Sequence, residues 1–168
     1  MANLSPVEKI KLKKIFSDPV LWAKCFLISN DAVTRKKGPW IARDYQKEML
    51  RDRSIRKVYR CARRLGKSEV MVVDALWMAF TREHFRVIFV TPYERQVNMI
   101  FMRIREFIHE SPLVKNEVTR MINSPYAIEF KNNSSIMGFT TGASSGSGAA
   151  SIRGQRADWN IQSTEYGE

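Results

Sequence analysis

An eight-residue stretch that ends in Gly-Lys-Ser constrains the fold of this chain more than any other feature. Ile55–Arg60, just before it, is short and rich in β-branched and aromatic residues, which favours a β-strand. After it, apolar residues recur at helical spacing from Val70 to Phe80 with no Gly or Pro between them. The order of strand, tight loop and helix predicts an α/β fold with a parallel sheet and a nucleotide-phosphate site. The loop comprises Cys61, Ala62, Arg63, Arg64, Leu65, Gly66, Lys67 and Ser68.

The chemistry of such a loop follows from its position at a helix start. Unpaired backbone N–H groups and the positive end of the helix dipole bind polyphosphate oxygens there. In this arrangement Lys67 is expected to neutralise the β- and γ-phosphates of a nucleoside triphosphate, and the Ser68 hydroxyl to be a ligand of Mg²⁺. Cys61 stands where such loops usually begin with glycine. The alternative is that Gly-Lys-Ser falls at a helix start by accident and the loop arginines are solvated.

A loop that ends Arg-Arg-Leu-Gly-Lys-Ser without a leading glycine resembles the deviant nucleotide loop of the large terminase subunits of tailed bacteriophages. These are ATP-driven motors that package DNA into procapsids. The resemblance implies a P-loop NTPase core of the RecA-like (ASCE) type that uses ATP and Mg²⁺. It gives Arg63 a role in nucleotide contact and in triggering hydrolysis, with Arg64 as the lesser candidate.

The same resemblance implies the partners and the location of the protein. The partners are double-stranded DNA, a portal protein and a small terminase subunit, and the full-length protein is expected to form a homo-oligomeric ring. The location is the host cytoplasm, beside the procapsid during packaging.

The charge of the chain agrees with a polyanionic partner. Its 168 residues carry a net charge of +11, and the cations are clustered. Nucleic acid is the first candidate for such a partner and an anionic membrane the second, whereas a merely soluble basic surface is the alternative. Cys25 and Cys61 lie in unrelated contexts, which predicts neither a disulfide framework nor a zinc site. No stretch is apolar enough to span a membrane, and we expect no membrane partner.

The chain divides into three expected parts. Residues 1–38 form a helical lead-in, because Ser5-Pro6 with Glu8 predicts one helix start and Asp18-Pro19 predicts another. Ser29–Gly38 is polar and basic, which predicts a loop. Residues 39–159 form the ATPase core, and residues 160–168 form an atypical tail.

Gln46 lies about twenty residues before Lys67, on an expected helix that ends near Leu50. In helicases and terminases a glutamine at this distance binds the adenine edge, because a carboxamide both donates and accepts hydrogen bonds. Gln46, after Tyr45, is therefore the candidate for adenine recognition. The alternative is a solvent-facing position on the helix.

The middle of the chain predicts the rest of the sheet. Phe85–Val90 is a short apolar run typical of a buried parallel strand, and the polar turn Thr91-Pro92-Tyr93 precedes an amphipathic helix. In the family, this strand end helps to couple nucleotide state to DNA; a helix cap is the alternative. Three further short strands are expected, the last two joined by a turn at Asn132-Asn133 into a β-hairpin. They span Val118–Ile122, Ala127–Lys131 and Ser135–Phe139, and a Gly- and Ser-rich loop, Thr140–Ser151, follows them.

The chain departs from the family at the second nucleotide motif. There a buried strand should end in Asp-Glu, to order Mg²⁺ and to activate water. Ser163 and Thr164 stand at these positions; Glu165, one residue away, is the candidate for the catalytic carboxylate, and Glu168 is a second one. The polar residues after Trp159 do not predict a buried strand. We therefore expect the ATPase core to be truncated near this strand and the family's nuclease domain to be absent.

Three functions remain open at this point. The first is the ATPase domain of a packaging motor. The second is a nucleotide- or nucleic-acid-binding module that does not hydrolyse ATP. The third is a fragment like a superfamily 2 helicase, which would usually have the leading glycine that Cys61 replaces.

Overall fold

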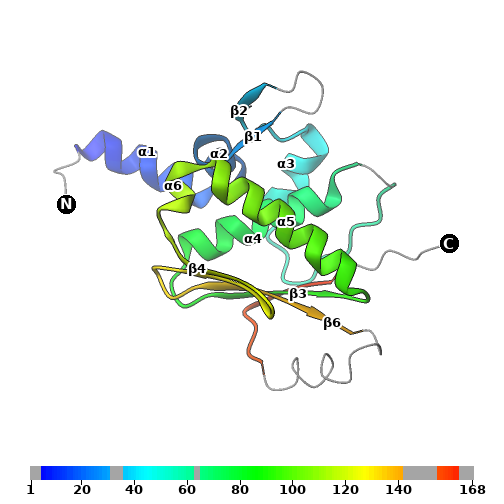
Figure 1. Cartoon of the computed structure of the whole chain (residues 1–168). Helices are drawn as coiled ribbons and strands as arrows, with labels where there is room; N and C mark the ends of the chain where they lie inside the picture. The colour runs from blue at the N-terminus through cyan, green and yellow to red at the C-terminus, as the bar shows by residue number, and fades with distance from the viewer. Residues whose placement is uncertain (1–4, 31–35, 63–64, 142–154, 163–168) are drawn as a thin grey trace.

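The computed structural model describes residues 5–30, 36–62, 65–141 and 155–162. Its centre is a five-stranded mixed sheet in the order β4-β5-β6-β3-β7, and the long helices α4 and α5 lie together on one face of it (Figure 1). The fold is therefore α/β, as predicted. The bounds of the helices are α1 Pro6–Ser17, α2 Pro19–Phe26, α3 Asp44–Arg51, α4 Lys67–Thr81, α5 Glu94–Glu110 and α6 Pro112–Lys115.

The core of the sheet is parallel and its outer part is a hairpin. The central strand β3 (Arg86–Thr91) pairs in parallel with β6 (Ser135–Thr140) on one side and with β7 (Trp159–Gln162) on the other. On the far side of β6, β5 (Tyr126–Phe130) and β4 (Val118–Asn123) add two antiparallel strands. The predicted hairpin is confirmed.

The two N-terminal helices begin where their sequence signals predict. The Ser5 N–H donates to the Glu8 carboxylate at 2.8 Å, and the Glu8 N–H donates to the Ser5 hydroxyl at 3.3 Å, which closes the capping box of α1. Asp18 caps α2 by accepting from a backbone N–H at 2.9 Å. Helix α2 packs on α3 and α4, so the lead-in rests on the helical layer above the sheet.

The segment after α2 is not wholly a loop, and the prediction for Ser29–Gly38 is wrong at both ends. Residues Ile28–Asn30 (β1) and Lys37–Pro39 (β2) form a small antiparallel ladder. The Ile28 N–H also donates to the Ser111 hydroxyl at 2.9 Å, which ties the ladder to the end of α5. Polar composition hid these strands because most of their side chains are not buried.

The expected strand at Ile55–Arg60 is also wrong, because residues 55–60 form no strand in the structure. The side chains of Ile55 and Val58 are 89% and 95% exposed, so the apolar residues that suggested a strand are not buried. Polar contacts with α3 and α4, described below, hold this segment instead.

Conversely, the polar stretch after Trp159 does begin with a strand, contrary to the sequence prediction. Strand β7 pairs with β3 through residue 162, with Val90 opposite Gln162. Only Ile161 within β7 is buried, and an edge strand of this kind can be polar at its other positions. Residues 163–168, with Ser163, Thr164 and Glu165, lie outside the described part of the chain. So do residues 142–154, which include most of the Gly- and Ser-rich loop Thr140–Ser151.

The sheet and helix α5 are packed so closely that β6 needs a glycine where they meet. A Cβ atom added at Gly138 would lie 2.6 Å from both Val97 and Phe101 of α5. These two side chains are completely buried, so neither can move away without disturbing the core.

We therefore predict that Gly138→Ala lowers the free energy of unfolding by about 1–3 kcal/mol, the usual range for overpacking a core. Denaturant titration followed by circular dichroism measures this change. Gly38→Ala is the matched control, because nothing lies within 4 Å of a Cβ atom there. Its effect should stay within about 0.5 kcal/mol. Equal effects of the two substitutions would contradict the packing described here.

Candidate nucleotide-binding site

The end of the predicted loop is held in a conformation that favours glycine. Gly66 is the N-cap of α4 and has φ 79°, in the left-handed region. A Cβ atom at this position would lie 2.9 Å from Nε2 of Gln46. The backbone angle and the close approach of Gln46 thus both require glycine at position 66.

Lys67 bridges the loop from its end to its beginning. Its ammonium group donates to the carbonyl oxygen of Cys61 at 2.9 Å. Ser68 follows in the first turn of α4, where its side chain is exposed. The first turn of a helix presents N–H groups that the helix itself cannot satisfy. The structure therefore brings a lysine ammonium, a serine hydroxyl and a helix N-terminus together at one end of the loop.

Helix α3 braces this loop from the side. Gln46 is only 4% exposed, and its Oε1 accepts from the Arg43 N–H at 2.9 Å. The alternative of a solvent-facing Gln46 is therefore wrong. The Tyr45 hydroxyl donates to the carbonyl oxygen of Leu65 in the loop. Sequence distance suggested that Gln46 belongs near the loop, and the structure places it against Gly66.

The other predicted site residues have different surroundings. Cys61 is half-buried, and Ala62 and Leu65 are exposed. Arg63 and Arg64 lie outside the described residues, as does Glu165. Over the described ranges, no three or more His, Cys, Asp or Glu side chains are placed to hold a metal ion together.

A cavity of about 890 Å³ opens next to the loop. Lys67 and Ser68 line it from α4, residues 55–59 line it from the segment before the loop, and all of β7 lines it from the sheet. The start of α4 and the last described strand of the sheet therefore face the same space.

The strand end Thr91-Pro92-Tyr93 forms a tight turn at the start of α5. The Thr91 side chain is buried, and its hydroxyl donates to the Tyr93 carbonyl at 2.9 Å. Tyr93 is the N-cap of α5 without a side-chain hydrogen bond. The turn therefore has a structural role in connecting β3 to α5, and its role in coupling stays a prediction.

Asp74, in the middle of α4, is a charged residue that the sequence analysis missed. It is buried, and it pairs with Arg53 at 3.2 Å and with Lys57 at 3.9 Å. Removal from water raises the pKa of the Asp74 carboxyl, while the charges of Arg53 and Lys57 oppose that rise. A single aspartate on an otherwise apolar helix face was the available signal.

The contacts of Asp74 extend to the sheet. The Lys57 side chain is 7% exposed, and its ammonium lies 5.2 Å from the ring centroid of Trp159 in β7. Burial lowers the pKa of Lys57, and the Asp74 charge opposes this shift. Lys57 thus joins the segment before the loop to both α4 and β7.

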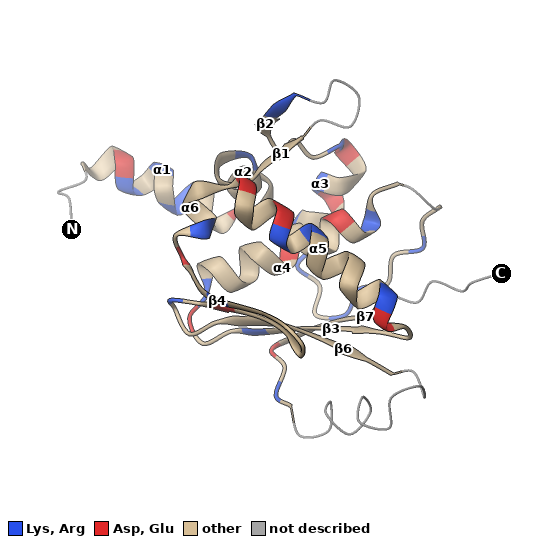
Figure 2. Cartoon of the chain, in the orientation of Figure 1, with Lys and Arg blue, Asp and Glu red and all other residues tan. Residues whose placement is uncertain are grey.

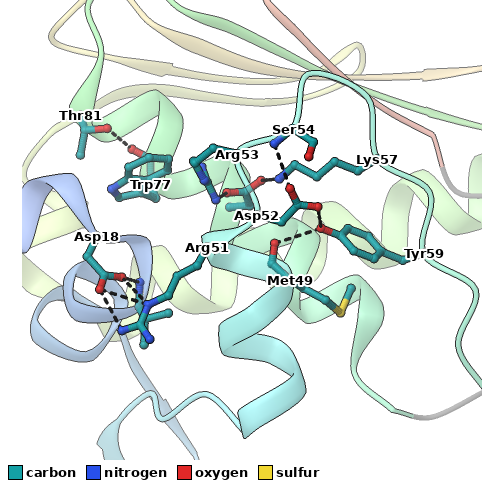
Figure 3. A network of polar contacts seen from close by, with 12 residues as sticks. Asp18, Met49, Arg51, Asp52, Arg53, Ser54, Lys57, Tyr59, Trp77 and Thr81 are labelled. Carbon is teal, nitrogen blue, oxygen red and sulfur yellow. Dashed lines mark hydrogen bonds and ion pairs between the residues drawn. The ribbon is translucent and has the colours of Figure 1, made fainter.

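A second contact fixes the same segment to α3. The Tyr59 hydroxyl lies 2.9 Å from Oδ2 of Asp52 and 3.1 Å from the carbonyl oxygen of Met49 (Figure 3). Hydrogen bonds from Ser54 and then from Tyr59 lower the pKa of Asp52 to about 2. Together with the ion pairs of Asp74, this contact explains why residues 55–60 do not join the sheet.

Glu69, in the first turn of α4, makes a separate set of contacts that hold the start of this helix. Its carboxylate accepts from the Trp40 indole at 3.1 Å and pairs with Arg103 of α5. Arg103 also pairs with Glu106 at 2.7 Å. The first turn of α4 is thus fixed to α5 and to the stretch before α3, which limits its freedom to move.

This chain is similar to known proteins in its structure but not detectably in its sequence. No family model and no curated protein sequence matches it. The fold is similar to the crystal structure of the large terminase of bacteriophage HK97, with a TM-score of 0.68 and 13% sequence identity. The match covers 88% of this chain and 30% of that chain. The chain therefore has a fold similar to that of part of a large terminase and spans under a third of that protein. Within the described residues, no helix is long and apolar enough to cross a membrane.

The Asp52 contact gives a pH-dependent prediction. We expect Asp52 to titrate near pH 2, and Tyr59→Phe to raise its pKa toward the ordinary value of 3.8. Because the folded pKa is the lower one, the stabilisation from this contact is present above pH 3.8 and is lost as the pH falls toward 2. Carboxyl titration followed by NMR measures both values.

Tyr93→Phe is the control for this titration, since Tyr93 is exposed and no contact of its hydroxyl is found among the described residues. It should leave the Asp52 midpoint unchanged. A wild-type midpoint near 3.8 would contradict the contact between Tyr59 and Asp52.

Proposed function

We propose that this chain is the ATP-binding motor domain of a DNA-packaging machine of the large-terminase type. It binds ATP with Mg²⁺ and double-stranded DNA, and it drives genome translocation into a procapsid. The observation that carries the proposal is the end of the loop, where a left-handed Gly66 starts α4, Lys67 spans the loop and Gln46 lies alongside. The similarity of the fold to a large terminase supports it.

The residues of the loop fit a nucleoside triphosphate. Lys67 now donates to a neutral carbonyl oxygen, and a phosphate oxygen is a stronger acceptor for the same ammonium. The free N–H groups at the start of α4 would bind the phosphates, and the Ser68 hydroxyl would hold Mg²⁺. Bound Mg²⁺ would neutralise charge on the β- and γ-phosphates. Gln46 would bind the adenine edge through its amide.

The roles of the loop arginines and of the catalytic carboxylate rest on the family resemblance. Arg63 would contact the γ-phosphate and stabilise charge in the transition state, with Arg64 as the lesser candidate. Glu165 would activate the attacking water. In this proposal the portal protein and the small terminase subunit are the protein partners, a ring is the working assembly, and the host cytoplasm is the location.

The proposal is tested by measuring ATP binding and ATP hydrolysis separately on the same chain. We expect ATP–Mg²⁺ to bind and Lys67→Ala to weaken binding at least about tenfold, since a charge-assisted contact to phosphate is worth roughly 1.5–3 kcal/mol. Isothermal titration calorimetry measures the affinity. Lys131→Ala is the matched control, because Lys131 pairs with Glu117 on the sheet side of the molecule. The control should bind ATP as the wild type does.

Hydrolysis then separates the candidate functions. Turnover that rises with added duplex DNA, and that Glu165→Gln abolishes, supports a packaging motor. Binding without turnover, with or without DNA, would replace the motor by a non-hydrolysing module. If ATP does not bind, or if Lys67→Ala binds it equally well, the loop is not a nucleotide site.

A further inference from the structure

Three of the cations that precede the loop are already paired with carboxylates within the molecule. Arg51 pairs with Asp18 at 2.9 Å (Figure 3). Arg53 and Lys57 pair with Asp74. Phosphates of DNA would have to compete with carboxylates for these cations. Arg51, Arg53 and Lys57 are therefore poor candidates for the DNA-binding surface. Arg56 and Arg60 are exposed and have no ion pair among the described residues, but they are only two cations.

Helix α1 carries a larger cluster of cations that are not paired with carboxylates. Lys9, Lys11, Lys13 and Lys14 are all exposed, and in the described part of the chain none of them has a carboxylate within ion-pair distance. The helix buries no residue completely. Its only acidic residue, Glu8, is occupied with the capping box at Ser5. Four unpaired lysines in six positions make α1 the most concentrated available charge among the described elements.

The C-terminal end of α1 is firmly anchored, although the rest of the helix projects from the molecule (Figures 1 and 2). The Trp77 indole of α4 donates to the Phe16 carbonyl at 3.0 Å. The Phe16 ring packs on Phe26 and Phe80, with centroid distances of 5.4 and 6.1 Å. The lysines are thus presented on an anchored helix that begins at a closed capping box.

We propose that α1 is a contact surface for the phosphate backbone of duplex DNA. This inference rests on the proposed function, because it names the surface through which the motor domain binds its DNA. Twelve helical residues extend about 18 Å, and duplex DNA carries one negative charge per about 1.7 Å of its axis. Four flexible ammonium groups along such a helix can therefore reach several phosphates at once.

The lysines occupy several sides of α1, which suits a backbone contact without base recognition. Val7 and Ile10 are also exposed on this helix. An acidic protein surface is the other partner that such a helix could bind, and the experiment distinguishes the two.

The test compares two variants of the full chain that lose the same charge. The first replaces Lys9, Lys11, Lys13 and Lys14 by Gln, which preserves helix propensity. The matched control replaces four other exposed cations that have no ion pair among the described residues, namely Arg86, Arg95, Lys115 and Arg120, by Gln. Affinity for a random-sequence DNA duplex is measured by fluorescence anisotropy from about 50 to 200 mM salt, where backbone contacts are strongly salt-dependent.

We expect the α1 variant to bind DNA at least about tenfold more weakly at about 100 mM salt. The slope of log K against log salt should fall in magnitude by about 2–3, because each lost phosphate contact removes roughly 0.9 and lysines on different sides of the helix do not all reach one duplex. The control should change much less in both quantities. Both variants must keep the wild-type melting temperature, and single Lys→Gln substitutions replace any variant that does not.

Each of the other possible results of this DNA-binding experiment has a distinct meaning. If the wild type fails to bind DNA even at low salt, the DNA-binding part of the proposed function is wrong. If the wild type binds and the α1 variant binds with the same affinity and slope, α1 is not the DNA surface, and an acidic protein becomes the candidate partner. Equal losses in the two variants would show that net charge, not α1, determines the affinity.

Discussion

The contact between Gln46 and Gly66 is the constraint on which the candidate site depends. It requires a residue without a side chain at the start of α4, and the left-handed angle of Gly66 requires the same. Lys67 and Ser68 follow Gly66 directly in the first turn of α4, where Ser68 is exposed. Because Tyr45 donates to the carbonyl of Leu65, α3 holds the loop at two successive residues. The loop end is therefore shaped by an element from earlier in the chain.

Buried charge fixes the other side of the loop. Asp74 would be costly to bury alone, and removing one partner of a buried pair typically costs about 3–5 kcal/mol. Arg53 and Lys57 compensate it, and in doing so they hold the segment that leads into Cys61 against α4. Glu69 and Arg103 hold the same helix from the side of α5. The start of α4 is thus positioned by two separate sets of ionic contacts.

Local signals in the sequence predicted local structure well. The caps at Ser5 and Asp18 and the turn at Asn132-Asn133 each depend on neighbouring residues, and the structure confirms them. The strand predicted at Ile55–Arg60 failed because its contacts with Asp74 and Asp52 depend on the tertiary fold. Strand β7 was missed because its own composition is polar, and it forms only by pairing with the free edge of β3 in the folded protein. Spacing pointed to Gln46, but its burial against Gly66 could not be predicted from spacing alone.

In the proposed function, the loop that ends at Gly66 and its neighbour Gln46 bind the nucleotide. The most direct measurement is hydrogen–deuterium exchange with and without saturating ATP–Mg²⁺. We predict slower exchange in peptides that cover the first turn of α4 and in those that cover α3 around Gln46, because bound phosphates engage the open N–H groups and stiffen both elements. Exchange in α1 should not change. If ATP binds and protects only segments away from Gly66, the nucleotide site lies elsewhere and the account is wrong.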